Sequence, residues 1–385
     1  MTSDWQMMKV ENFIEFNPRL SIKQGTMATK VSMDKLQPFT KFIMQAEKAI
    51  FSSGSRFCNG DIILARITPC LENGKTAFVD ILAENEIAFG STEFIVLRAK
   101  EGISDSQYVY YLAISPKFRD IAIKSMVGSS GRQRVQIDVL KNLELKLPSL
   151  IIQKKIGKIL ANIDKKIALN QKINDNLQQQ ATTLFNQFYD QAQIEISFTD
   201  VIRILGGGTP KTSERSYWNG NVPFFTPKDV GSPYTLITEK TITKEGLAHC
   251  NSRLYPIHTV FVTARGTVGK IGIAGVPMAM NQSCYALFGK DINQLLVYFY
   301  TRKVVDRLKH KANGAVFDAI TTRDFESESI RMLTNDSVKT FLDVVEPMYQ
   351  VLLSNNIENL RLAALRDSLL PKLISGEIDV SSIHF

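Results

Sequence analysis

Residues 150–189 read LIIQKKIGKILANIDKKIALNQKINDNLQQQATTLFNQFY, a stretch with one glycine and no proline. Apolar or small uncharged residues recur in it at alternating steps of four and three. That spacing is typical of a helix that packs on another helix along one narrow stripe. Residues 338–374 repeat the phase, although Glu346 and Asp367 interrupt the stripe and Pro347 predicts a kink or a delayed helix start. The sequence therefore predicts two long helices.

Each helix, at roughly 38 residues, would be about 55 Å long. The natural partner for each apolar stripe is the other helix, in an antiparallel coiled coil, although packing of each helix on its own domain remains an alternative. Asn170 and Asn356 occupy the same position in the two stripes and could meet near a local twofold axis, where a buried Asn pair fixes register. The predicted seam consists of Ile156, Leu160, Ile163, Ile167, Asn170, Leu177 and Leu184, with Leu342, Tyr349, Leu353, Asn356, Leu360 and Leu370.

The sequence contains an internal repeat, with one copy before and one copy after the first long helix. GSSGRQRVQIDVLKNLELKLPS (128–149) aligns with GAVFDAITTRDFESESIRMLTN (314–335), which places Gly128 on Gly314 and Asp138 on Asp324. A repeat of this length predicts duplicated domains rather than a solenoid. Two shorter matches lie upstream, FGSTEF (89–94) with MNQSCY (280–285), and KVSMDKL (30–36) with FFTPKDV (224–230).

A further repeated segment resembles a phosphate-binding loop but lacks its chemistry. ARITPCLENGKTAFV (65–79) aligns with ARGTVGKIGIA (264–274), Arg66 on Arg265 and Gly74-Lys75 on Gly269-Lys270. A P-loop needs glycine where the first copy has Pro69, which has no N–H for phosphate. GGGTPKT (206–212) also fails as a P-loop, because Pro210 stands where the glycine before Lys211 should be. Both copies instead predict a strand, a glycine turn and a strand.

These patterns predict a fold of the α/β (α+β) class. Two similar globular domains are expected at residues 1–147 and 191–335, with the long helices at 148–190 and 336–385, the latter range including a C-terminal segment. The chain ends where a domain would begin, and VENFIEF near the N-terminus resembles FTDVIRI in the second copy. We therefore expect a closed, pseudo-twofold circular arrangement.

Composition limits the class of protein and its partners. The chain has 385 residues and a net charge of +8, and such a charge favours a polyanionic partner. The four cysteines lie far apart without a C-x-x-C pair, which fits a reducing cytoplasm and argues against structural zinc. No apolar run approaches a membrane span, and the first residues do not resemble a signal peptide. We expect a cytoplasmic protein that does not enter a membrane.

No catalytic or metal site is evident in the sequence. An N6-adenine methyltransferase would need an Asn/Asp-Pro-Pro-aromatic stretch, and the nearest one, Asn17-Pro18-Arg19, does not qualify. The four histidines form no H-E-x-x-H pattern. His249-Cys250 with His258 could begin a metal site, but a fourth ligand is missing. We predict that the chain is not an enzyme and binds no metal or cofactor.

With the repeat in place, GGGTPKTSERSYWNGNVPFF (206–225) and RDSLLPKLISGEI (366–378) make the chain resemble the specificity (S) subunit of a type I restriction–modification system. The resemblance implies two target-recognition domains, each reading one half of a bipartite double-stranded DNA site. It also implies that the coiled coil separates them and docks two methyltransferase (M) subunits, onto which restriction (R) subunits can assemble. S-adenosylmethionine and ATP would bind to those other subunits. The first domain departs from the pattern, since RLSIKQGTMATKVSMDKL (19–36) replaces the GGTP segment.

DNA affinity should come from Lys and Arg on phosphates, and sequence readout from side chains that reach base edges. A helical spacer of this length suits half-sites about one DNA turn apart or somewhat more. The aromatic pair Tyr217 and Trp218 could instead belong to a core. The candidate DNA-binding residues are Arg66, Asn73, Lys75, Arg132 and Arg134 in the first domain, and Lys211, Arg215, Tyr217, Trp218, Arg265, Thr267 and Lys270 in the second.

Two other functions remain open. The chain could be a non-catalytic protein scaffold whose helices bind partners without DNA. It could also be a DNA-modifying enzyme with unrecognised motifs, although duplication of every element predicts two equivalent surfaces rather than one dominant active site. Salt dependence separates the first alternative from a DNA reader, because only phosphate contacts weaken steeply with salt.

Overall fold

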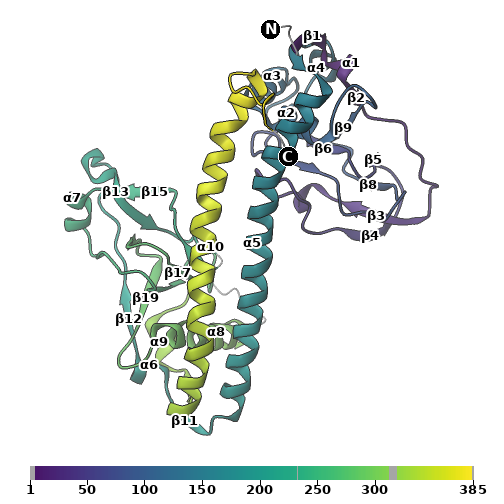
Figure 1. Ribbon diagram of the computed structural model, residues 1–385. Coiled ribbons are helices and arrows are strands. Elements are labelled where there is room, and N and C mark those ends of the chain that lie inside the picture. The colour runs from purple at the N-terminus through teal and green to yellow at the C-terminus, as the bar shows by residue number, and fades with distance from the viewer. Residues whose placement is uncertain (1–4, 232, 312–318, 384–385) are drawn as a thin grey trace. The chain divides into compact units, whose positions relative to one another are not determined.

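The computed structural model describes residues 5–231, 233–311 and 319–383 (Figure 1). The chain divides into two compact units, each described by itself. Unit 1 combines Met1–Leu169 with Leu360–Phe385, and unit 2 is Asn170–Asn359. The predicted match at Gly314 lies outside the described residues. In the part of the chain that is described, no helix is long and apolar enough to cross a membrane.

Two helices are far longer than the rest, α5 (Leu150–Gln191) and α10 (Asn335–Ser375). Each unit contains one end of both helices, and in each unit the two segments run antiparallel. In unit 2 Asn174 contacts Asn356, and Phe185 contacts Phe341 further along. In unit 1 Asp164 of α5 pairs with Arg366 of α10. The predicted antiparallel helix pair is therefore confirmed within each unit.

Pro347 neither delays nor ends α10, so of the two predicted effects, a kink or a late start, the late start is wrong. The helix begins at Asn335 and continues through this proline. Pro347 faces solvent, and the missing N–H removes only one internal hydrogen bond. Phe341, Val345 and Tyr349 on the opposite face are fully buried and offset that loss.

The predicted seam residues differ in burial. Ile156, Leu160, Asn170, Tyr349 and Leu370 are buried, whereas Leu360 is 39% exposed. The others are half-buried: Ile163, Ile167, Leu177, Leu184, Leu342, Leu353 and Asn356.

Near the end of α5 the buried residues are instead Ala181, Phe185 and Tyr189, which recur every four residues. Phe185 stacks on Phe299 of α8 (Gln294–Lys311), with ring centroids 5.0 Å apart. Here α5 packs on the domain as well as on α10. Both packing arrangements considered from the sequence are therefore present.

The central asparagines pair one turn away from the predicted register. Asn174 Nδ2 donates to Asn356 Oδ1 (2.9 Å), and Asn355 donates to Asn174 (2.8 Å). Asn170 donates to Asn359 (2.9 Å) rather than to Asn356. The repeat identifies equivalent positions, but the two equivalent asparagines do not face each other across the helix pair.

Unit 1 contains a two-stranded ribbon and two four-stranded sheets. The ribbon pairs β1 (Trp5–Lys9) with β10 (Glu144–Pro148). One sheet has the order β2 (Ile14–Phe16), β9 (Phe94–Ala99), β6 (Ile62–Ala65), β7 (Thr76–Phe78); the other has β4 (Glu47–Ile50), β3 (Met27–Val31), β8 (Ala88–Gly90), β5 (Ser55–Phe57). The short helices are α1 (Val10–Phe13), η1 (Met33–Lys35), α2 (Ser106–Ile114), α3 (Pro116–Lys124) and α4 (Ile137–Lys141).

Unit 2 also contains a two-stranded ribbon and two sheets, here of five and three strands. Its ribbon pairs β11 (Ile194–Ser197) with β20 (Ser329–Met332). Its sheets have the orders β12 (Ile202–Gly206), β19 (Cys284–Gly289), β16 (Val260–Thr263), β17 (Ile271–Ala274), β14 (Tyr234–Thr235), and β15 (Lys240–Ile242), β13 (Trp218–Phe225), β18 (Ala279–Met280). The remaining helices are α6 (Phe198–Val201), η2 (Arg215–Tyr217), α7 (Lys244–Ala248) and α9 (Thr322–Glu326).

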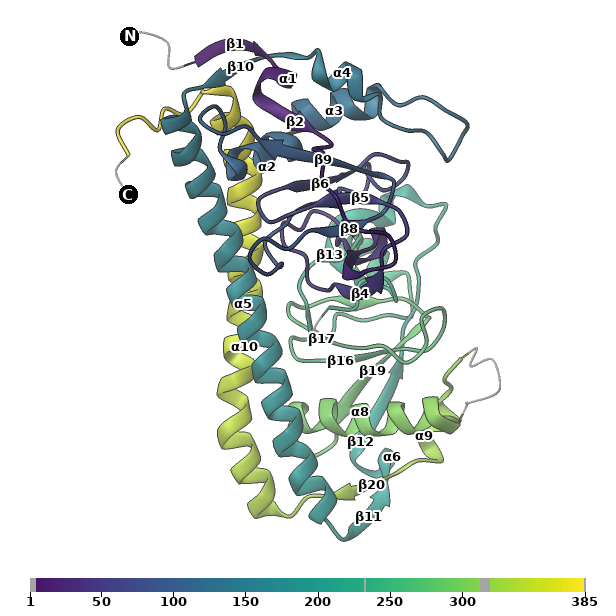
Figure 2. The same cartoon turned by 90° about the vertical axis from the view of Figure 1, so that its right-hand side faces the viewer.

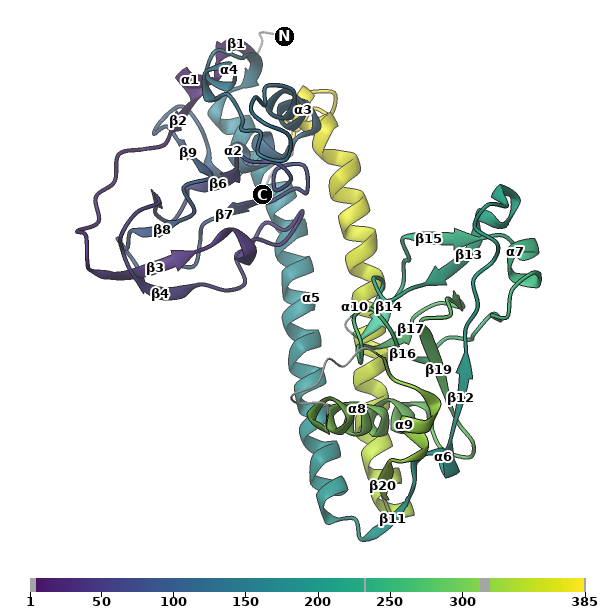
Figure 3. The same cartoon turned by 180° about the vertical axis from the view of Figure 1, so that it is seen from behind.

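Strand topology confirms the duplication. In unit 1 β3 pairs parallel with β8 and antiparallel with β4. In unit 2 β13 pairs parallel with β18 and antiparallel with β15. α8 packs on β16, β17 and β19 (Figure 2), while α7 packs on β13 and β15 (Figure 3). Mixed sheets with helices outside the strand alternation make each unit α+β.

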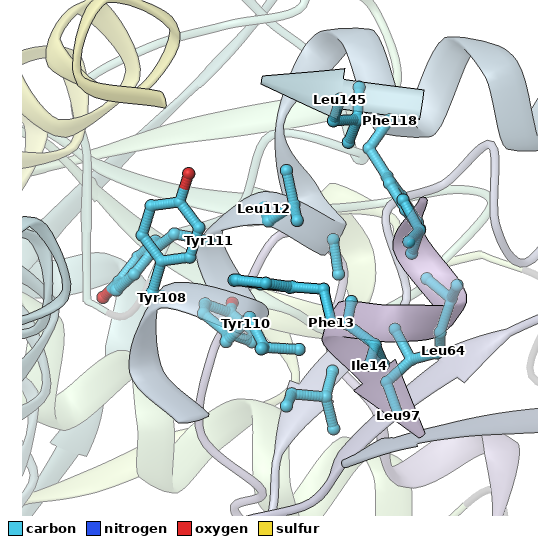
Figure 4. Packing of buried hydrophobic residues seen from close by; sticks show 14 of the residues in the cluster. Phe13, Ile14, Leu64, Leu97, Tyr108, Tyr110, Tyr111, Leu112, Phe118 and Leu145 are labelled. Atoms are coloured by element: carbon cyan, nitrogen blue, oxygen red, sulfur yellow. The ribbon is translucent and has the colours of Figure 1, made fainter. Parts of the chain in front are cut away.

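The core of unit 1 is rich in aromatic residues. Helix α2 supplies Tyr108, Tyr110 and Tyr111, all buried, because its apolar residues cover every face rather than one stripe. Phe13 packs edge-to-face on Tyr108, with ring centroids 5.9 Å apart. Figure 4 shows these rings beside Ile14 and neighbouring aliphatic side chains.

A buried polar chain links this core to both long helices within unit 1. Lys41, 3% exposed, donates to Gln107 and to the Tyr111 hydroxyl (3.0 Å). Tyr111 donates to Asp164 of α5 (2.5 Å), and Asp164 pairs with Arg366 of α10 (2.8 Å). Each polar group compensates its neighbour for the loss of water.

Candidate nucleic-acid interface

Four separate segments of unit 2 meet at one place. Gly208 N donates to Met280 O (3.2 Å), and Asn281 N donates to Phe225 O (2.9 Å). Ala264 N donates to Ser283 O (2.7 Å). The segments 206–210, 224–230, 264–270 and 280–283 are therefore joined by backbone hydrogen bonds, although they are far apart in the sequence.

A cavity of about 660 Å³ lies at this junction and has a strongly basic lining. Four of its residues are cationic and one, Glu239, is acidic; Glu239 lies 3.6 Å from Lys228, with both side chains largely exposed. Such a surface attracts phosphate groups. The lining consists of Thr226, Pro227, Lys228, Glu239, Lys240, Arg265, Gly266, Thr267, Lys270, Asn281 and Ser283.

Three predicted residues, Arg265, Thr267 and Lys270, line this cavity together. The turn that carries them is held by Thr263, whose hydroxyl accepts from Lys270 N (2.9 Å) and donates to Thr267 O. Gly269 adopts φ +74°, a conformation that favours glycine. The turn therefore presents an exposed arginine and lysine from a fixed backbone.

The other predicted residues of unit 2 lie outside the cavity lining. Lys211 and Arg215 are exposed. Trp218 Nε1 donates to Lys211 O (3.2 Å), and the Trp218 ring packs edge-to-face on Phe224 at 5.5 Å. Tyr217 stacks on His249 at 5.0 Å. Both aromatic residues are thus half-buried supports of the loop as well as partly accessible surface.

In unit 1 the corresponding turn is more enclosed. Lys75 Nζ donates to Met33 O (2.9 Å), and Asn73 is exposed. Arg66 is half-buried, and its Nε is buried without a hydrogen-bond partner among the described residues. Gly74 has φ +72°, and an added Cβ would lie 2.6 Å from the Phe39 ring.

The backbone of this turn also excludes a phosphate loop. Gly74 N donates to Leu71 O (2.8 Å), and Lys75 N donates to Cys70 O (3.1 Å). These N–H groups are used within the turn, so they cannot surround a phosphate.

The last two predicted residues, Arg132 and Arg134, lie on the basic loop of unit 1 in different surroundings. Arg132 is exposed. Arg134 forms a bidentate ion pair with Glu93, with Nη2 to Oε1 at 2.6 Å and Nε to both carboxylate oxygens at 3.0 Å. The hydrogen bonds from Arg134 lower the pKa of Glu93. Glu93 was not among the predicted residues, because nothing in the local sequence indicates a partner 41 residues away.

The predicted equivalence of Arg66 and Arg265 is wrong by one residue. Arg66 N donates to Glu93 O (2.9 Å), as Ala264 N does to Ser283 O. Val135 N donates to Arg66 O, and Ile320 N donates to Ala264 O, both at 2.9 Å. Arg66 therefore corresponds to Ala264, and the alignment of FGSTEF with MNQSCY shifts by one as well. The extra residues in the first copy hid the shift, because the two Ala-Arg pairs look alike.

No metal site is found among the residues that the structure describes. His258 Nδ1 lies 3.2 Å from the Tyr234 hydroxyl, and His249 stacks on Tyr217. The His249, Cys250 and His258 set considered from the sequence does not converge.

The sequence profile described as type I restriction modification DNA specificity domain matches residues 2–179 and 194–332. The chain belongs to this family. The two matches are the two copies of the repeat, so the duplicated units are two specificity domains. Specificity subunits are the DNA-recognition components of type I restriction–modification enzymes, and this chain is one of them by family.

Similar proteins carry the same description. The specificity subunit of the type I restriction enzyme HindI from Haemophilus influenzae is 24% identical, over 87% of this chain and 88% of its own length. The MjaIX specificity subunit from Methanocaldococcus jannaschii is 33% identical over 31% of this chain and 29% of its own. The crystal structure of the S subunit from M. genitalium superposes with a TM-score of 0.57 at 16% identity, covering 99% and 98% of the two chains. That likeness extends to the fold alone.

Proposed function

We propose that this chain is the non-catalytic subunit that reads a bipartite double-stranded DNA site for a type I restriction–modification complex. Unit 1 and unit 2 would each read one half. The observation that carries the proposal is the basic cavity of unit 2, in which Lys228, Lys240 and Arg265 come from three segments of one specificity domain. A corresponding turn, with Lys75 and Arg134 nearby, supports the same role for unit 1.

The proposal includes partners and cellular location. Two methyltransferase subunits would dock on α5 and α10, whose exposed faces carry residues such as Leu169, Ile173 and Val351. Restriction subunits could join that complex. S-adenosylmethionine and ATP would be bound by the partners, and the complex would act in the cytoplasm. The helix pair would set the unread gap between the half-sites.

We expect Lys240→Gln with Arg265→Gln to weaken DNA binding and to reduce its salt dependence. Each cation that contacts a phosphate contributes about 0.9 to the slope of log K against log salt, so the slope should fall by roughly 1.8. The measurement is fluorescence anisotropy of a duplex with the assembled methyltransferase complex between low and physiological salt.

The matched control is Arg203→Gln with Arg331→Gln, which removes two exposed charges of β12 and β20 outside the cavity. Its slope should equal that of the unaltered complex. Equal slopes for all three complexes would remove the cavity from the interface. Salt-independent behaviour throughout would favour a scaffold without DNA contacts.

A further inference from the structure

Each unit has an isolated β-bridge at the corresponding place, and each bridge includes one arginine. The arginine lies on one side of the bridge in unit 1 and on the other side in unit 2. In unit 1 the bridge joins Ile67 to Arg134, and in unit 2 it joins Arg265 to Ala319. The hydrogen bonds of Arg66 and Ala264, one residue earlier, show that the two bridges correspond. The two specificity domains therefore present the same type of side chain at this place in different geometries.

The residue facing this bridge also differs. Glu93 O and Ser283 O accept equivalent hydrogen bonds from Arg66 N and Ala264 N, so Glu93 and Ser283 occupy the same position. Only unit 1 has a carboxylate there. That carboxylate holds Arg134 through Nε and Nη2, while the Arg134 side chain remains 44% exposed.

The ion pair fixes the guanidinium without using all of its donors. Arginine has five N–H groups, and Glu93 takes Nε–H and one Nη2–H. One Nη1 proton and the second Nη2 proton form the adjacent edge. A guanidinium edge matches O6 and N7 of guanine in the major groove, which is the commonest specific contact of arginine with DNA. Holding the side chain in advance lowers the entropy that binding would cost.

We propose that Glu93 is a positioning residue that orients Arg134 to read a guanine in the half-site of unit 1. This inference rests on the proposed function. Unit 2 lacks the carboxylate, so Arg265 is not oriented in this way, and the two domains differ in base choice at this place.

The test uses Glu93→Gln, which keeps the size and one acceptor oxygen but removes the charge. Arg134→Lys is the second variant, because it keeps the charge and removes the guanidinium fork. Each chain is co-expressed with the methyltransferase subunit in a host without adenine methylation, and methylated adenines are mapped across the genome. In both variants the preference for guanine at one position of one half-site should fall at least about fivefold. The other half-site should be unchanged.

Ser283→Ala, at the equivalent position of unit 2, is the matched control and should leave that guanine preference intact. Arg132→Gln should lower methylation at all sites together. If the Arg134→Lys variant kept the preference for guanine, the proposal would be overturned regardless of the result with Glu93→Gln. The guanidinium fork would then be dispensable. Absence of any motif with the unaltered chain would instead contradict the proposed function itself.

Discussion

Replacing Arg366 with methionine should destabilise unit 1 by about 3 kcal/mol. Asp164 is 5% exposed and loses its ion-pair partner in this variant, and an uncompensated buried charge costs about 3–5 kcal/mol. The lower end of the range applies because Tyr111 still donates to the carboxylate. The measurement is urea unfolding followed by Trp5 fluorescence in a Trp218→Phe background, which reports on unit 1.

Two further variants make this test specific. Arg361→Met removes an exposed arginine from the same helix and should change the stability by less than about 0.5 kcal/mol. Combining Asp164→Leu with Arg366→Met removes both charges and should recover most of the loss. If the single and double variants were equally unstable, the buried charge would not be the cause.

The stability of unit 1 should rise between pH 8 and pH 9.5. Burial lowers the pKa of Lys41 to about 8, whereas the unfolded chain keeps the value of 10.5. Between these values the unfolded state binds more protons, so the free energy of unfolding increases with pH. Across these 1.5 pH units the gain from Lys41 is roughly 1.5 kcal/mol, because folded Lys41 is still half protonated at pH 8. Above about pH 10 the sign reverses, because burial and Asp164 raise the pKa of Tyr111.

Lys41→Met is the control for this pH dependence. It removes the titrating group while keeping an unbranched side chain among Phe78, Tyr110 and Tyr111. The free energy of unfolding of the unaltered protein minus that of Lys41→Met, measured at pH 7.5, 8.5 and 9.5, should become more positive as pH rises. A constant difference would mean that Lys41 does not titrate in this range.

Much of the fold could be predicted because it depends on patterns within short stretches. The heptad spacing of 150–189 and its repeat led to two antiparallel long helices, and Gly74 and Gly269 were correctly matched as turn glycines with positive φ. Duplication of the domains was visible in the sequence and is confirmed by the strand pairing. These features depend on local geometry, which neighbouring residues determine.

What could not be predicted depends on contacts between distant residues. The ion pair of Glu93 with Arg134, and the chain from Lys41 through Asp164 to Arg366, join side chains that no local pattern connects. The helix register and the one-residue shift at Arg66 were missed for the same reason. Several matches were individually weak, and only the backbone hydrogen bonds distinguish one register from the next.

The most direct test of the central claim is a genome-wide map of methylated adenines in a host that lacks adenine methylation. The chain would be co-expressed there with the methyltransferase subunit, and in a parallel culture the subunit would be expressed alone. We expect a two-part motif with a fixed unread gap that is absent when the chain is omitted. Methylation that is identical with and without the chain, although the two proteins copurify, would contradict its role as the DNA reader.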